Sequence, residues 1–274
     1  MFKIIIMALL IFIGMVGYDN ITDKAQPTTP VQQEQQKISK HEKSAAMALF
    51  TSLLPPKEEW PSPVHKFYLA FNMDEVIDPI RQNPNWTALD AMSRDIPQAL
   101  IAIEDHGFYN HGAIAVEGIL RAALANINAG EVVQGGSTLT QQFVKNVFLS
   151  HEQSMERKIE EAILSLMLED NYSKDEILEL YLNTTYFGAG STGIKQASRT
   201  YFGKAPSALT LAEAAVIASL PYAPTGLNPL ENPEGCKKRQ LLVLAAMHKY
   251  GMINQGQLAE AKAEKIRLTN STVM

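Results

Sequence analysis

Two adjacent carboxylates, Glu104 and Asp105, end an apolar stretch that begins at Ile96. The apolar residues recur at helical spacing, and the carboxylates lead into a loop that contains glycine, phenylalanine and histidine. A carboxylate at the end of an apolar helix is suited to general acid or base catalysis, because its surroundings can tune its affinity for a proton. The alternative interpretation is a solvated helix end whose residues contact an aromatic ring.

A second group of polar side chains follows two glycines in residues 134–146. Its members are Ser137, Thr138, Thr140, Gln141, Gln142 and Lys145. So many short polar groups beside a glycine turn are suited to binding phosphate or sugar oxygens. A simple helix cap, with Lys145 on a solvated face, is the alternative. The segment is not a Walker A loop, because the Gly-Lys-Ser/Thr ending is absent.

Arg157 and Glu161 lie four residues apart at the start of an amphipathic stretch that runs to about Asp170. The spacing places both side chains on one face of a helix. A carboxylate and a cation there could bind a substrate, and an ordinary helical ion pair is the alternative.

Three glycines, Gly188, Gly190 and Gly193, spell G-x-G-x-x-G. A dinucleotide-binding fingerprint requires a strand immediately before the first glycine. The preceding residues are capped and spaced as a helix instead, so the pattern does not predict a Rossmann fold.

The elements that must position these groups are predicted to be mainly helical, because strand-like alternation is scarce. Two helix starts have the pattern of a capping box: Ser173 with Glu176, and Thr210 with Glu213. A further helix is expected within residues 255–274.

Length and composition are typical of one main globular domain with a substantial core, since 46% of the 274 residues are apolar and 19% are charged. The net charge of -5 argues against a general electrostatic affinity for nucleic acid, although a local basic cluster could bind phosphate. A single cysteine, Cys236, cannot form an internal disulfide and lacks the surroundings of a nucleophile. No cysteine and histidine cluster has the spacing of a zinc site.

The N-terminal region has the pattern of an exported protein. An uninterrupted apolar run over residues 4–18 follows Lys3 and is shorter than the roughly 20 residues of a usual spanning helix. Residues 1–18 are therefore predicted to be a signal anchor or a cleaved signal peptide, with the anchor favoured. Residues 19–44 have the composition of a polar linker, and residues 45–274 form the predicted catalytic domain.

In this order, the segments resemble the peptidoglycan glycosyltransferase domain shared by class A penicillin-binding proteins and monofunctional transglycosylases. The matched residues are Glu104, Asp105, Phe108 and His111 in E-D-x-x-F-x-x-H, residues 135–142 in G-x-S-T-x-T-Q-Q, Arg157, Lys158 and Glu161 in R-K-x-x-E, Lys174, Ile177, Tyr181 and Asn183 in K-x-x-I-x-x-x-Y-x-N, and Arg239, Val243 and Leu244 in R-R-x-x-V-L. The resemblance extends from about Phe67 to Tyr250.

The resemblance implies a mainly α fold, with a lysozyme-like larger lobe and a smaller membrane-associated jaw lobe at residues 114–133. It implies an inverting glycosyltransferase that polymerises lipid II into linear β-1,4 glycan strands and releases the lipid diphosphate. The implied partners are lipid II, the growing lipid-linked glycan chain, the bilayer and other cell-wall synthesis proteins, without nucleic acid. The implied location is the cytoplasmic membrane, with a single span and the catalytic domain on its outer side.

The resemblance also implies roles for individual residues. Glu104 would be the general base on the acceptor 4-hydroxyl, and Glu161 the second carboxylate, at the donor diphosphate. The cations expected to stabilise the diphosphate are Arg121, Lys145, Arg157 and Lys158, while Ser137, Gln141 and Asn183 would bind sugar or phosphate oxygens. The remaining expected substrate-binding residues are Asp105, Phe108, His111, Thr138, Tyr181 and Arg239. A divalent cation, Mg or Mn, would bind with the substrate diphosphate and have no dedicated ligand set in the chain.

Several positions depart from the family pattern. Ala113, preceded by Gly112, stands where the family usually has glycine, and Ala115 where it often has an acidic residue. Glu160 replaces a residue that is often basic, and Gln240 replaces the second arginine of the last motif. These changes predict a weaker positive field around the diphosphate.

Two other classes of function fit part of the sequence. A lysozyme-like glycan hydrolase also uses two carboxylates, but it has no diphosphate for the lysines and arginines to bind. A non-catalytic cell-wall scaffold would not need both Glu104 and Glu161.

Overall fold

The computed structural model describes residues 68–69, 72–120, 127, 135–149 and 155–274. The predicted anchor (1–18), the predicted linker (19–44) and Arg121 lie outside the described residues. The chain divides into two compact units, Met1–Phe71 and Asn72–Met274. The second unit contains all five motifs and is the one described below.

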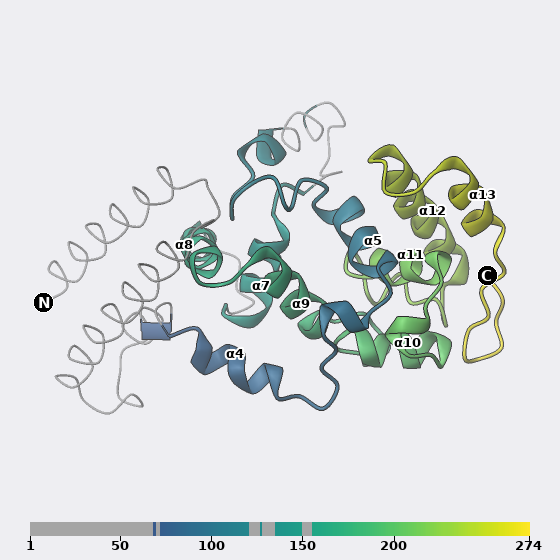
Figure 1. Ribbon diagram of the computed structural model, residues 1–274, viewed down its shortest axis with the longest axis horizontal. Coiled ribbons are helices and arrows are strands. Elements are labelled where there is room, and N and C mark those ends of the chain that lie inside the picture. The colour runs from purple at the N-terminus through teal and green to yellow at the C-terminus, as the bar shows by residue number, and fades with distance from the viewer. Residues whose placement is uncertain (1–67, 70–71, 121–126, 128–134, 150–154) are drawn as a thin grey trace, which may run out of the picture. The chain divides into compact units, whose positions relative to one another are not determined.

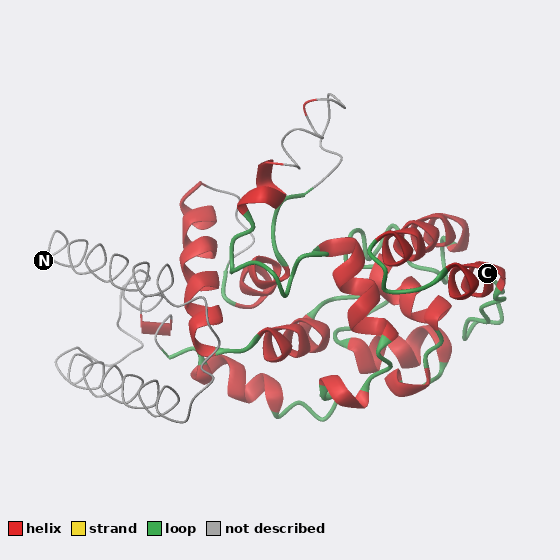
Figure 2. Cartoon of the chain, turned by 45° about the horizontal axis from the view of Figure 1, so that its top comes forward, coloured by secondary structure: helices red, strands yellow, loops and turns green. Residues whose placement is uncertain are grey.

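The second unit is helical, which confirms the prediction of a mainly α protein (Figure 2). Its labelled elements within the described residues are α4 (Asp74–Arg81), η2 (Leu89–Ala91), α5 (Asp95–Glu104), α7 (Leu139–Val147), α8 (Met155–Asn171), α9 (Lys174–Thr184), α10 (Ile194–Phe202), η3 (Pro206–Ala208), α11 (Leu211–Ser219), α12 (Pro233–Lys249) and α13 (Gln255–Ala263). Residues 116–120 are also helical. Among the described residues, two isolated β-bridges occur, Tyr186 with Thr192 and Arg267 with Val273.

Side-chain caps fix where several helices begin. The two predicted capping boxes are confirmed: Ser173 caps α9 with Glu176, and Thr210 caps α11 with Glu213. Thr138 caps α7 in the same way. Each such cap supplies an acceptor to a backbone N–H group that has no partner within the helix, and is typically worth about 1 kcal/mol.

The core is built around α11, which packs against α5 and α12 (Figure 1). All the residues of α11 from Ala212 to Ser219 are buried, and four of them are alanine, so that neighbouring helices can approach closely. A second group of helices consists of α7 with α8 and α9. The apolar half of α5 is fixed in the first group, while its last residue, Glu104, is partly exposed.

The glycine-rich loop after α9 is not a dinucleotide-binding turn, because the element before it is the helix Lys174–Thr184, as predicted. Two of its glycines allow another backbone segment to pass close by. A Cβ at Gly188 would lie 2.3 Å from the Pro224 carbonyl oxygen, and one at Gly193 would lie 2.6 Å from the Asn183 carbonyl oxygen. Both residues also have positive φ, which disfavours any other residue type there.

Within the described residues, no helix is both long enough and apolar enough to cross a bilayer. The predicted single span falls on residues 1–18, which the structure does not describe.

Candidate active site

Glu104 is held in place by a chain of two hydrogen bonds. The Gln142 side-chain amide donates to Oε2 of Glu104 at 3.0 Å, and the Tyr181 hydroxyl donates to Oε1 of Gln142 at 2.9 Å. Tyr181 is almost fully buried, and burial followed by the nearby charge of Glu104 raises the pKa of its hydroxyl. The phenol therefore stays protonated, and its donation to the amide oxygen directs the amide NH₂ group towards Glu104.

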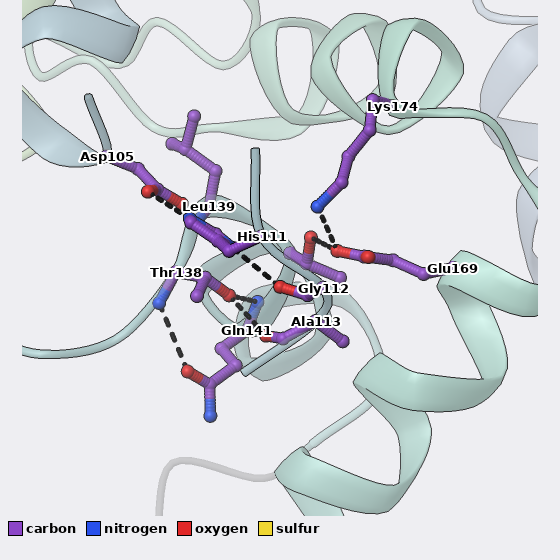
Figure 3. A network of polar contacts seen from close by, with 10 residues as sticks. Asp105, His111, Gly112, Ala113, Thr138, Leu139, Gln141, Glu169 and Lys174 are labelled. Atoms are coloured by element: carbon purple, nitrogen blue, oxygen red, sulfur yellow. Dashed lines mark hydrogen bonds and ion pairs between the residues drawn. The ribbon is translucent and has the colours of Figure 1, made fainter. Parts of the chain in front are cut away.

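Asp105, the neighbour of Glu104, connects two segments of the site (Figure 3). Its Oδ1 pairs with Nε2 of His111 at 2.6 Å, and its Oδ2 accepts from the backbone N–H of Leu139, the first residue of α7, at 3.0 Å. The hydrogen bond to Asp105 is the main cause that raises the pKa of His111, which favours the imidazolium form. Asp105 thus joins the loop after α5 to the N-terminus of α7, where a negative charge also complements the helix dipole.

Thr138 and Gln141 form the capping box of α7. Thr138 Oγ1 accepts from the Gln141 N–H at 3.1 Å and donates to the Ala113 carbonyl at 2.7 Å, while the Gln141 side-chain oxygen accepts from the Thr138 N–H at 3.1 Å. Both residues are buried. Their hydrogen bonds position the backbone, and substrate binding by either residue stays a prediction.

Glu161 and Ser137 are joined by one lysine. Lys158 forms an ion pair with Oε1 of Glu161, and its Nζ donates to the Ser137 hydroxyl at 3.2 Å. The Glu161 side chain is 2% exposed, whereas that of Lys158 is 47% exposed. The buried carboxylate therefore holds an ammonium group that can still face an anionic ligand.

Phe108 and Lys174 belong to a third cluster. The Lys174 ammonium lies 4.6 Å from the centroid of the Phe108 ring and 2.6 Å from Oε1 of Glu169. The same Glu169 oxygen accepts from the Thr140 hydroxyl at 2.5 Å. This cluster connects the ends of α8 and α9 to the first turn of α7 (Figure 3).

Asn183 forms its side-chain hydrogen bonds with residues outside these clusters. Its Oδ1 accepts from the Thr87 N–H at 2.8 Å, and its Nδ2 donates to the carbonyls of Thr87 and Glu179 at 2.9 and 2.8 Å. One turn earlier, Glu179 accepts from Trp86 Nε1 and the Leu89 N–H. Both side chains attach the segment before η2 to α9, and substrate binding by Asn183 stays a prediction.

The predicted cations occupy different elements. Lys145 is exposed in the last turn of α7, and Arg157 lies on α8 beside Lys158. Arg239 lies on α12 with its guanidinium 4.2 Å from the centroid of the Tyr222 ring. The neighbouring Gln240 is fully buried and donates to the Ala212 carbonyl at 2.8 Å, so this departure from the family pattern joins α12 to α11.

Gln142 and Glu169 carry contacts that the sequence interpretation did not assign. The helical spacing of α7 contained a signal for Gln142. Successive residues on a helix project about 100° apart, so a glutamine next to the capping residue Gln141 lies on a different face and can contact another part of the protein. No comparable signal marked Glu169, whose partner Thr140 is 29 residues distant in the chain.

The N-terminal part of α7 is the element that these groups share. Ser137 contacts the pair Lys158 and Glu161, Leu139 binds Asp105, and Gln142 binds Glu104. Gly136 allows the close packing, since a Cβ there would lie 3.0 Å from Cα of Ile119. This arrangement is typical of an enzyme that moves a proton with one carboxylate and holds an anionic group with a cation.

Comparison with known proteins identifies the family. The transglycosylase family model matches residues 73–248. A putative transglycosylase of Cupriavidus necator is 41% identical over 194 residues, which cover 71% of this chain and 84% of that protein. Penicillin-binding protein 2D of Bacillus subtilis is 45% identical over 181 residues, and penicillin-binding protein 1A of Aquifex aeolicus is 44% identical over 176 residues. These matches cover 66% and 64% of this chain but only 26% and 24% of the two penicillin-binding proteins.

The chain therefore belongs to the transglycosylase family, the peptidoglycan glycosyltransferases that polymerise glycan chains. The matched range contains all the motifs described above.

Proposed function

We propose that the chain extends glycan strands by transferring the lipid-linked glycan from its diphosphate to the 4-hydroxyl of an incoming lipid II molecule. The observation that carries this proposal is that the N-terminal part of α7 contacts both a partly exposed carboxylate and a lysine that is paired with a buried carboxylate. Gln142 of α7 orients one carboxylate, Glu104, and Ser137, just before α7, contacts Lys158, which is paired with the buried carboxylate of Glu161. Deprotonation of an alcohol and departure of a diphosphate need these two functions.

In the proposed step, Glu104 accepts the proton of the acceptor hydroxyl. The hydroxyl oxygen forms a bond to the anomeric carbon of the donor, while the bond from that carbon to the diphosphate oxygen breaks. The electron pair of the broken bond leaves with the lipid diphosphate, and the configuration at the anomeric carbon inverts. General base catalysis of this kind typically contributes about 10² to 10⁴ in rate.

Lys158 is the cation that the structure best supports for the leaving diphosphate. Its ammonium is half exposed, and Glu161 and Ser137 hold it from the protein side. A preorganised charge of this kind stabilises the diphosphate without a reorganisation cost during the reaction. Glu161 then acts by positioning Lys158, and Lys145, Arg157 and Arg121 are proposed to add to the positive field.

A divalent cation, Mg or Mn, is proposed to accompany the substrate diphosphate. Within the described residues, no group of three or more His, Cys, Asp or Glu side chains could hold a metal ion.

The membrane is the proposed location of the reaction. Residues 116–120 form a short helical segment on which Val116, Ile119 and Leu120 are 64%, 44% and 60% exposed, and Ile127 is 75% exposed. Apolar side chains at this helical spacing are suited to an interfacial surface. We propose that they belong to the jaw lobe, that the remaining helices form the lysozyme-like lobe, and that residues 1–18 anchor the enzyme at the outer face of the cytoplasmic membrane.

Polymerisation of labelled lipid II tests the proposal. The purified protein is incubated in detergent with a divalent cation and labelled lipid-linked disaccharide pentapeptide, beside Glu104→Gln. Polymer from the wild type alone supports both the reaction and the base. No polymer from folded wild type, or release of soluble fragments from purified sacculi, would refute it.

A further inference from the structure

His111 has an oxygen acceptor at each of its two ring nitrogens (Figure 3). Nε2 lies 2.6 Å from Oδ1 of Asp105, and Nδ1 lies 2.6 Å from the carbonyl oxygen of Gly112. A carbonyl and an ionised carboxylate can only accept hydrogen bonds, whereas a neutral imidazole has a proton on one nitrogen and a lone pair on the other. Only the imidazolium form donates at both positions. The geometry therefore favours a protonated ring.

The surroundings of Asp105 favour its ionised form. Its second oxygen, Oδ2, accepts a hydrogen bond from the backbone N–H of Leu139 at 3.0 Å. Leu139 is the first residue of α7, and the N-terminal end of a helix dipole stabilises a negative charge. The proton between Asp105 and His111 is therefore placed on the imidazole, and the pair is ionic.

The charged side chains around the ring come from α5, α8 and α9. Asp105 follows the last residue of α5, Lys174 is the first residue of α9, and Glu169 of α8 pairs with Lys174 at 2.6 Å. The hydrogen bond with Asp105 is the main cause that raises the pKa of His111, while burial and the charge of Lys174 oppose it. The side chain of His111 is 20% exposed, so the ring can exchange its proton with water.

The loop that carries His111 is joined to the start of α7 at two points. At the first, Asp105 accepts from the first backbone N–H of the helix. At the second, the N-cap residue Thr138 donates its hydroxyl to the Ala113 carbonyl at 2.7 Å. His111 supports both points, because Nε2 orients Asp105 and Nδ1 holds Gly112, the neighbour of Ala113.

The start of α7 in turn contacts both catalytic clusters. Ser137, just before the helix, accepts from Lys158 at 3.2 Å, and Gln142, in the first turns, donates to Glu104 at 3.0 Å. Movement of this segment would change the orientation of the base and of the cation together. A misplacement of about 1 Å in an active site can cost roughly 10²-fold in rate, so the support of this segment matters for catalysis.

We propose that protonated His111 is a positioning residue for glycan transfer. It holds the loop after α5 against the start of α7, and thereby keeps Glu104 and Lys158 in their working orientation. Loss of the Nε2 proton would turn a lone pair towards Asp105, and loss of the Nδ1 proton would turn one towards Gly112. Either loss weakens one of the two links to α7. The inference rests on the proposed function, because it takes Glu104 as the base and Lys158 as the cation of that reaction.

The pH dependence of kcat in lipid II polymerisation tests this role. His111→Gln keeps an amide that can donate to Asp105, but the amide is uncharged at every pH and has no second donor aimed at Gly112. At pH 6, we expect the wild-type kcat to exceed that of the variant by roughly three- to tenfold, as for replacement of a charge-assisted hydrogen bond by a neutral one. The ratio should fall towards one at pH 9, because the wild-type ring loses its proton. Titrations that both proteins share cancel in this ratio.

His248→Gln is the matched control. His248 lies on α12, and its Nδ1 contacts the carbonyl of Ile253 at 3.1 Å, so it belongs to a different part of the fold. The ratio of kcat values for this variant should stay the same at pH 6 and pH 9. An equally constant ratio for His111→Gln would show that the ring only fills space, and would overturn the proposal.

Nuclear magnetic resonance of the full wild-type chain tests the link to α7 without turnover. The six histidines and the backbone amides are labelled with ¹⁵N, and the signals are assigned through sequential connectivities. At pH 6 we expect both ring nitrogens of His111 to be protonated. As the pH rises, the Leu139 amide signal should shift with the same midpoint as the ring. A neutral ring at pH 6, or a Leu139 amide that does not follow the ring, would overturn the proposal.

The two experiments separate this inference from the proposed function. Coupled titration of His111 and Leu139 in a wild type that forms no polymer at any pH would support the link to α7 and refute the proposed function. Polymer formation with the same pH profile in the wild type and in His111→Gln would support the proposed function and overturn the role of His111.

Discussion

The hydrogen-bond chain from Tyr181 through Gln142 to Glu104 predicts a ranked set of kinetic defects. Gln142→Met keeps the length of the side chain and removes the amide that donates to the carboxylate. A hydrogen bond to a charged group is worth about 1.5 to 3 kcal/mol. We expect the orientation of the Glu104 carboxylate to matter when it accepts the proton. Loss of the hydrogen bond should then lower kcat by about 10- to 150-fold, because each 1.36 kcal/mol in the barrier corresponds to a tenfold change in rate. KM should change by less than about twofold, because the bond joins two protein groups and is not a contact with the substrate.

Tyr181→Phe removes only the neutral hydrogen bond that orients the amide, which is worth about 0.5 to 1.5 kcal/mol. We therefore expect kcat to fall by about two- to twelvefold. The double variant should match Gln142→Met alone, because Tyr181 acts through Gln142.

Kinetics of lipid II polymerisation at saturating and limiting substrate provide the assay, with thermal denaturation of each variant as a check on folding. Tyr172→Phe is the matched control, since Tyr172 is a buried tyrosine whose hydroxyl binds Asp74 instead. Additive losses in the double variant, or a larger defect in Tyr181→Phe than in Gln142→Met, would refute the proposed chain. A rise in KM at constant kcat would show that Gln142 binds substrate rather than orienting the base.

Three further predictions concern stability and reactivity. The pKa of His111 in the folded protein is raised above 6.5, chiefly by its hydrogen bond with Asp105. The pairing therefore contributes its full stabilisation below about pH 6.5, and this contribution is lost as the pH rises through the raised pKa. The destabilisation by His111→Gln, measured by urea unfolding, should therefore be larger at pH 6 than at pH 9, and a difference that grows with pH would contradict this pairing. Gly193→Ala should lower the free energy of unfolding by about 2 to 3 kcal/mol, because φ is +84° and the new Cβ would approach the Asn183 carbonyl; an unchanged urea midpoint would count against that geometry. Cys236 is fully buried and burial raises the pKa of its thiol to about 11, so iodoacetamide at pH 8 should alkylate it only after denaturation, as mass spectrometry can determine.

The sequence was sufficient where a structure depends on neighbouring residues. The starts of α9 and α11 follow from caps that join residues three positions apart, and the helix before Gly188 follows from the same local spacing. The five motifs also identify the family, because their order and residue types are properties of the chain itself. The roles assigned to the motif residues remain predictions, since sequence resemblance transfers them without testing them.

Only the tertiary structure decided which groups the motif residues contact. Glu104 meets Gln142 across 38 residues, and Gln142 meets Tyr181 across 39, although the sequence predicted Tyr181 as a substrate-binding residue. Asn183 hydrogen-bonds a backbone segment 96 residues away in the chain. Helical periodicity specifies the face on which a side chain lies, but not the element that packs against that face. That choice depends on how the apolar faces of α5, α7 and α9 are buried together, and it determined which polar groups became partners.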